Sequence, residues 1–232
     1  MTLLITVLQI VAPVFLLSLI GFFWVKRGLE YRVAFVTQLA MSLSVPCLIF
    51  VALMNADIDR NVLAVTFIAA FVAYLLVTLV FIVIVKVLQL EIRTYLAPLI
   101  FGNTGNLGLP LAMFAFGEVG LSYAIIIFAV MAVYSFSFGV WLVSGGGSMV
   151  KVIKEPLVGS TLLGALFLYN GWHTPVWLTN TLELVGQMAI PMMLITLGVA
   201  LARLRPDNFG RAFALSVIKV VICTGLAWAT GI

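Results

Sequence analysis

Charged side chains are scarce in this sequence. Only 9% of the 232 residues are Asp, Glu, Lys or Arg, and 64% are hydrophobic, whereas soluble domains carry about 25% charged residues. This composition excludes a soluble globular domain and indicates an integral membrane protein. The twelve basic residues outnumber the eight acidic ones, but they are scattered among apolar runs without a basic face, so nucleic acid is not a predicted partner.

The sequence also has little of what catalysis and metal binding require. His173 is the only histidine, so neither a metal cluster nor a Ser/His pair can be assembled around it. Cys47 and Cys223 lie in separate apolar segments, where a thiol usually acts as a small hydrophobic group. A glycine-rich phosphate loop ending in Lys and Ser or Thr is missing as well, which argues against direct use of nucleotides. We therefore predict no enzyme activity, no metal and no cofactor.

Long apolar runs are what the sequence does have. With about 20 residues for one membrane crossing, it predicts eight transmembrane helices, at residues 3–25, 33–55, 62–87, 95–115, 119–144, 153–170, 178–202 and 210–231. The first run has no basic residue before it and no small-residue cleavage site, which favours a retained helix over a signal peptide. The breaks between helices include the turn GEVG at residues 117–120.

The basic residues predict the orientation of these helices. Arg60 falls on one side of the membrane and Lys219 lies within the last predicted helix. Ten basic residues fall on the other side, namely Lys26, Arg27, Arg32, Lys86, Arg93, Lys151, Lys154, Arg203, Arg205 and Arg211. Because cytoplasmic loops are rich in Lys and Arg, we expect a multi-pass protein of the plasma (inner) membrane with its N-terminus outside.

Two parts of the sequence repeat each other at an offset of about 145 residues. Pro13, Gly21 and Gly28 have the same intervals as Pro156, Gly164 and Gly171, and SVPCLIF around Pro46 resembles AIPMMLI around Pro191. Five helices separate the copies, and an odd number inverts the second copy in the membrane, as in many secondary transporters. The predicted organisation is a first repeat at 1–144, a cytoplasmic linker at 145–152 and a second repeat of three helices at 153–232.

The second repeat stops early in this sequence. Subtracting the offset from Ile232 leads to about residue 87, the end of the third predicted helix. The partners of the fourth and fifth helices are therefore missing from the second repeat. We expect either a fragment of a ten-helix protein or a naturally shortened one.

The stretch GNTGNLGLPL, residues 102–111, interrupts the fourth predicted helix with glycines, a proline and polar side chains. Irregular backbone is tolerated at membrane depth only where protein or a polar cavity surrounds it, and a helix beginning after Pro110 would direct its positive end toward an anion. Amide side chains donate and accept hydrogen bonds, which suits a carboxylate or a neutral polar group, whereas packing between helices is the alternative role for such residues. The predicted substrate-binding residues are Asn103, Thr104, Gly105, Asn106, Gly108 and Pro110.

Four further residues are candidates for a cavity lining. Pro46 and Pro191 either kink their helices or border the cavity, and Gln187 is one of the polar groups nearest to Pro191. Lys219 lies eight residues beyond Arg211 in the last helix. A lysine at this depth either snorkels to the interface or faces a cavity or a partner.

The segment NTGNLGLPL followed by FAFGEVGLSYAIIIFAVMAVYSFSFGVWL resembles the auxin efflux carrier family of membrane transporters, and the short linker at Gly145 is similar to bacterial members. The resemblance implies an all-α polytopic membrane protein with inverted five-helix repeats and a broken crossover helix, a fold like those of sodium/proton antiporters and bile acid symporters. Here the second repeat is incomplete and the second crossing helix is absent. The resemblance also implies that Asn103, Asn106 and Pro110 contact substrate at the crossing, and it suggests a homodimer.

The function implied by the resemblance is secondary transport of a small organic anion, such as malate, malonate or an auxin-like acid, by alternating access. The alternative class is a non-transporting membrane sensor or assembly partner. A carrier would give saturable flux in vesicles, whereas a sensor would bind its ligand without flux.

Overall fold

A computed structural model of the chain describes residues 2–56, 60–139, 141–142, 155–204 and 209–230. Within these ranges it contains α-helices and short π-helical turns and no strand. Six of the described helices are long and apolar enough to cross a membrane: Val7–Lys26, Val33–Met54, Val62–Val87, Leu109–Gly139, Val176–Arg203 and Gly210–Thr230. The chain is therefore an all-α, multi-pass membrane protein, as its composition predicts.

The other predicted spans take a different form. The one expected at 95–115 is interrupted and is divided between α5 (Ile92–Ile100), a π-helical turn η2 (Thr104–Gly108) and the beginning of α6 (Leu109–Tyr134). Helix α6 contains a non-helical residue, Gly117 (φ 65°, ψ −155°), at the predicted GEVG turn. The span expected at 153–170 is α9 (Pro156–Asn170), which is apolar but only 15 residues long.

The described elements fall into two compact units. The first contains α1 (Thr2–Lys26), α2 (Val33–Leu39), the π-helical turn η1 (Ala40–Ser44), α3 (Val45–Met54), η2, α6 up to Phe128, α9, α10 (Val176–Gln187) and α11 (Ala189–Arg203). The second contains α4 (Arg60–Val87), α5, the rest of α6, the π-helical turn η3 (Ser135–Gly139) and α12 (Phe209–Thr230). The predicted linker at 145–152 lies outside the described residues.

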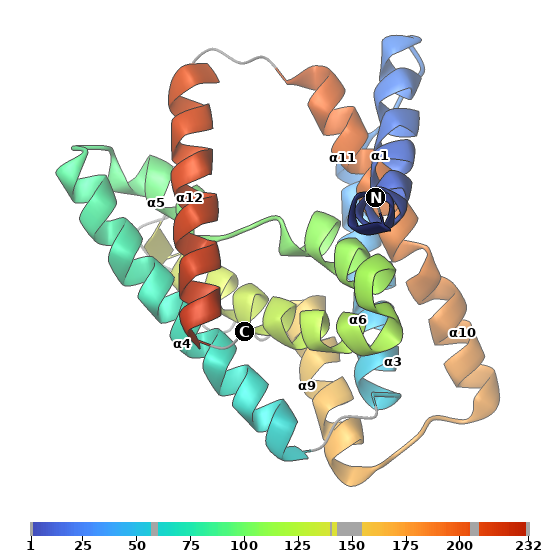
Figure 1. Cartoon of the computed structure of the whole chain (residues 1–232). Helices are drawn as coiled ribbons and strands as arrows, with labels where there is room; N and C mark the ends of the chain where they lie inside the picture. The colour runs from blue at the N-terminus through green and yellow to red at the C-terminus, as the bar shows by residue number, and fades with distance from the viewer. Residues whose placement is uncertain (1, 57–59, 140, 143–154, 205–208, 231–232) are drawn as a thin grey trace. The chain divides into compact units, whose positions relative to one another are not determined.

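Helix α1 packs along α11 in the first unit (Figure 1). The two backbones touch where glycine leaves room: a Cβ atom at Gly21 would meet the carbonyl oxygen of Ile195, and one at Gly198 would meet the carbonyl oxygen of Ser18. Small residues at such contacts allow helices in a membrane to approach closely. The Ser18 hydroxyl also donates to the Leu194 carbonyl oxygen at 3.2 Å, so side-chain and backbone contacts together fix this pair.

Helix α3 packs along α9 in the same unit. A Cβ atom at Gly164 would lie 3.0 Å from Cβ of Leu53 and 3.3 Å from Cα of Phe50. Gly21 and Gly164, which the predicted repeat pairs with each other, thus both lie at close helix contacts. Each contact joins the first helix of one predicted half to the second helix of the other predicted half. Gly28 (φ 77°) and Gly171 (φ 64°), which the predicted repeat also pairs with each other, both adopt the left-handed conformation just after their helices. The repeated glycine spacing thus coincides with two close helix contacts and two left-handed turns.

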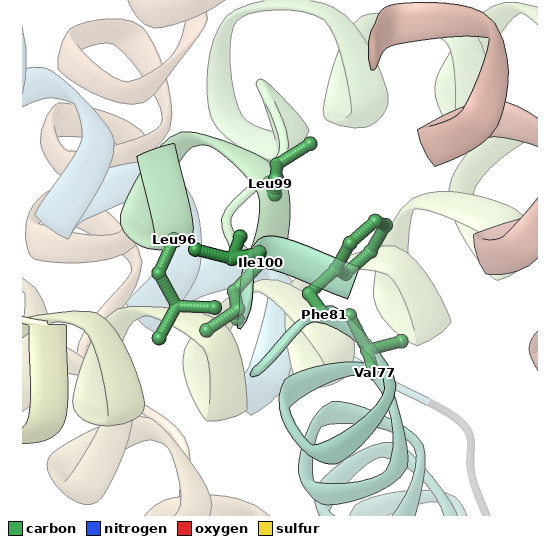
Figure 2. Packing of buried hydrophobic residues seen from close by; sticks show 6 residues of the cluster. Val77, Phe81, Leu96, Leu99 and Ile100 are labelled. Carbon is green, nitrogen blue, oxygen red and sulfur yellow. The ribbon is translucent and has the colours of Figure 1, made fainter. Parts of the chain in front are cut away.

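The core of the second unit lies between α4 and α5. Figure 2 shows Val77 and Phe81 from α4 packed with Leu96, Leu99 and Ile100 from α5. One face of α12 completes this cluster with partly buried side chains, namely Leu215, Ile218, Ile222, Cys223 and Leu226. The end of α5 is therefore held by apolar packing against two membrane-spanning helices.

Candidate functional site

The predicted interruption of the fourth helix is present. Helix α5 ends at Ile100, Phe101 has an extended backbone (φ −86°, ψ 123°), and helical structure resumes only after Asn103. The interruption is also where the chain passes from the second unit to the first. An apolar segment therefore contains backbone amide and carbonyl groups that no continuous helix satisfies.

The helix after the interruption begins earlier than the sequence predicts. It was expected after Pro110, but the π-helical turn η2 starts at Thr104 and continues into α6, with Pro110 as the second residue of α6. The Asn103 carbonyl oxygen accepts the amides of Leu107 at 3.1 Å and Gly108 at 3.2 Å. The side chain of Pro110 is fully buried. Because proline has no amide hydrogen, a regular helix would lose a hydrogen bond at this position, and the wider π-helical turn before it accommodates that loss.

The structure gives the predicted site residues different environments. Asn103 is exposed at the start of η2, and the side chain of Asn106 lies outside the described part. The Thr104 hydroxyl oxygen is buried and has no hydrogen-bond partner among the described residues. Gly105 is buried and a Cβ there would lie 3.1 Å from the Phe128 ring, whereas one at Gly108 would lie at an ordinary 3.6 Å from Thr104. Gly105 thus serves packing, and Thr104 has an unsatisfied polar group.

Lys219 binds the end of α5. Its ammonium group, half-way along α12, donates to the carbonyl oxygens of Pro98 at 2.6 Å and Phe101 at 2.8 Å. These carbonyls belong to the last turn of an interrupted helix, where the helix dipole places negative partial charge. Lys219 was predicted either to snorkel to the membrane interface or to face a cavity or a partner. These contacts favour a partner within the protein, and that partner is the backbone of α5.

Aromatic rings surround the same end of α5. Tyr134 contacts Phe101 with ring centres 5.8 Å apart and stacks on Phe138 at 5.2 Å. Its hydroxyl lies 3.1 Å from the hydroxyl of Thr78 on α4. These residues were not among the sequence-predicted ones, and the aromatic run in VYSFSFGVW was the available signal for them.

A cavity of about 640 Å³ lies within the first unit. Two predicted lining residues, Gln187 and Pro191, are part of its wall, while Pro46 is not among its lining residues. Its polar lining also includes Ser122 and two carboxylates, Glu118 and Glu183, which were not predicted as cavity residues from the sequence. The remaining lining residues are Leu17, Leu48, Val51, Ala52, Asn55, Met113, Phe114, Leu121, Gly186 and Ile190.

The charge of this cavity is negative. The Asn55 amide lies 3.5 Å from the Glu183 carboxylate, and no Lys or Arg is among the lining residues that the structure describes. A carboxylate ligand would meet two like charges here, which repel it. The cavity is therefore a poorer environment for an organic anion than the interrupted helix.

The two prolines lie at irregularities of their helices. Pro46 follows the π-helical turn η1 at the start of α3, and Pro191 lies in the first turn of α11, after the helix break at Met188. Both therefore lie in the first turn of a helix, where the amide hydrogen that proline lacks is least needed. Pro191 borders the cavity in addition.

Comparison with known proteins identifies a family whose match includes the interrupted helix. The model of a family described as membrane transport proteins, the auxin efflux carriers, matches residues 6–148, which is more than half of the chain and includes the whole interrupted segment. The chain belongs to the auxin efflux carrier family. No curated protein sequence matches it. As a member of this family the protein is a membrane transporter. Gln187, Pro191 and Lys219 lie beyond the matched residues.

Proposed function

We propose that this auxin efflux carrier family member moves a small organic anion across the membrane by secondary transport. The observation that carries the proposal is the helix interruption at residues 101–103, followed by the exposed Asn103 and the unpartnered Thr104 hydroxyl. A buried hydroxyl without a partner is a group that a ligand or a water molecule satisfies. The first-turn amides of a helix favour anions.

The proposed substrates are carboxylates such as malate, malonate or an auxin-like acid. Amide and hydroxyl side chains together with backbone amides can bind a carboxylate without a full positive charge. The candidate contacts are Asn103, Thr104, Asn106 and the backbone at Gly105, Gly108 and Pro110. The two carboxylates that line the cavity at Gln187 and Pro191 disfavour an anion there and so favour this location.

The proposed mechanism is alternating access by two inverted repeats. The packing of α1 on α11 and of α3 on α9 supports it, because helices that correspond in the predicted repeats exchange roles in the two contacts. Such reciprocal packing is expected of a two-fold related pair. The proposal includes an inner-membrane location, an outward N-terminus and a homodimer.

A thermal-shift series tests the substrate class. Purified protein is heated with malate, malonate or indole-3-acetate, and with the methyl esters of these acids as matched uncharged controls. A ligand at 100 times its dissociation constant stabilises the folded state by about 2.7 kcal/mol. We expect at least one free acid to raise the unfolding temperature and its ester not to do so.

Substitution locates the site within the same series. Asn103→Ala should abolish the shift, whereas Gln187→Ala in the acidic cavity should leave it intact. Equal stabilisation by acids and esters contradicts the anion proposal. Loss of the shift in Gln187→Ala but not in Asn103→Ala would move the site to the cavity of the first unit.

A further inference from the structure

The predicted cytoplasmic end of α1 carries two grooves that the proposed transport site does not use. The first, of about 490 Å³, is lined by one face of α1 and by Arg27 and Leu29 in the turn after it. The second, of about 520 Å³, is lined by α1, the turn after it, the beginning of α2 and Ile195 of α11. Ile20 and Trp24 line both grooves. All of these residues belong to the first unit.

The walls of the grooves are apolar and exposed. Leu16, Leu19 and Phe23, three and four residues apart on one face of α1, have 61%, 45% and 52% of their surface exposed. On the other side of Ile20 and Trp24, the second groove adds Phe35 at 63%. In a bilayer such faces contact acyl chains. Two adjacent grooves with a shared wall fit the two chains of one glycerophospholipid.

A positive charge without an acidic partner lies in the first groove. Arg27 is part of its lining, and among the described residues the Arg27 side chain makes no ion pair. In the second groove the charge of Arg32 is compensated, because its Nε lies 2.6 Å from the Glu30 carboxylate. A guanidinium group binds phosphate through two parallel hydrogen bonds. Arg27 is therefore the group that would select a lipid phosphate.

The ring between the two grooves is held in place. Trp24 Nε1 donates to the Glu30 carbonyl oxygen at 3.1 Å, which ties the indole to the turn after α1. Tryptophan side chains concentrate at this depth, where an apolar ring meets the polar headgroups. The indole thus forms a fixed wall just below the level of Arg27.

We propose that this surface binds one anionic glycerophospholipid of the cytoplasmic leaflet. Its phosphate contacts Arg27, and its two acyl chains lie on opposite sides of Ile20 and Trp24. Charge complementarity identifies the lipid class, because a zwitterionic headgroup would bring a second cation to Arg27, and a second copy of the chain would bring the same unpaired arginine. Lipid binding at this surface does not depend on which substrate is transported.

Tryptophan fluorescence tests the proposal. Trp24 is made the only tryptophan by changing Trp141, Trp172, Trp177 and Trp228 to Phe, and the full chain in detergent is titrated with phosphatidylglycerol or phosphatidylcholine carrying brominated chains. Bromine quenches a ring that it touches. We expect saturable quenching at about fivefold lower concentration for phosphatidylglycerol, since one basic residue contributes about that factor at an anionic surface.

Matched variants assign the effect to Arg27. In Arg27→Gln, the quenching curve for phosphatidylglycerol should coincide with that for phosphatidylcholine. Arg93 is a basic residue on the same predicted side of the membrane, and Arg93→Gln should leave the two curves apart. If the four changes to Phe prevent folding, the unfolding temperature of the otherwise unchanged chain with each lipid gives the same comparison. Equal curves for the two lipids, an equal effect of Arg93→Gln, or no quenching by either lipid overturns the proposal.

Discussion

At the interrupted helix, a single charged side chain provides hydrogen bonds to backbone groups that the helix leaves unpaired. The Lys219 ammonium donates to two carbonyl oxygens that the end of α5 leaves unpaired. In a membrane, a charged donor at a helix end removes the cost of leaving the last carbonyl oxygens without a hydrogen bond. Lys219 therefore supports the interrupted segment from the α5 side.

Replacing Lys219 by Met tests this role. The Pro98 and Phe101 carbonyl oxygens would lose their donor, and we expect the free energy of unfolding to fall by about 1–3 kcal/mol. The measurement is the thermal midpoint of the purified protein, with Lys86→Met at the end of α4 as the control. Lys219→Arg should recover part of the loss. A midpoint unchanged in Lys219→Met would mean that the ammonium group contributes nothing to α5.

At the level of helices, close backbone contact sets the packing of α1 on α11. The carbonyl oxygen of Ser18 occupies the space that a side chain at Gly198 would need. Backbone cannot rotate away as a side chain can, so the two helices must separate to admit even one methyl group.

Gly198→Ala is therefore expected to destabilise the protein by about 1–3 kcal/mol, despite the better helix propensity of alanine. Gly225→Ala in α12 is the control, since a Cβ atom there meets nothing within 4 Å. It should be neutral or slightly stabilising. The comparison is made by thermal unfolding in one detergent, and equal midpoints for both variants would contradict the contact.

At the level of the whole molecule, the orientation in the membrane remains a prediction from the basic residues. It places the turn at Leu29 in the cytoplasm and the loop containing His173 outside. Leu29 is 48% exposed in the structure, so a cysteine there can react with a reagent from water.

Cysteine labelling tests this orientation. In a chain with Cys47 and Cys223 changed to Ala, His173→Cys should react with a membrane-impermeant maleimide in intact cells. Leu29→Cys should react only after the membrane is opened. The reverse pattern would invert the predicted topology and move the proposed lipid site to the outer leaflet.

The sequence by itself determined the class of the protein and the places where its helices are interrupted. Apolar runs, the glycines and proline of residues 102–111 and the turn at Gly117 act through local backbone geometry, so they can be predicted without neighbours. The repeated glycine spacing predicted an internal repeat, but not the helix contacts that Gly21 and Gly164 make.

Only the tertiary structure decided what the side chains contact. Lys219 meets carbonyl oxygens 121 and 118 positions away in the chain, Gly105 packs on Phe128, and Glu118 and Glu183 share one cavity with Gln187. The helices of a membrane protein are apolar both where they face lipid and where they face other helices. The hydrophobic pattern of the sequence therefore does not show which face contacts which. Long-range packing therefore assigned each of these residues to its partner.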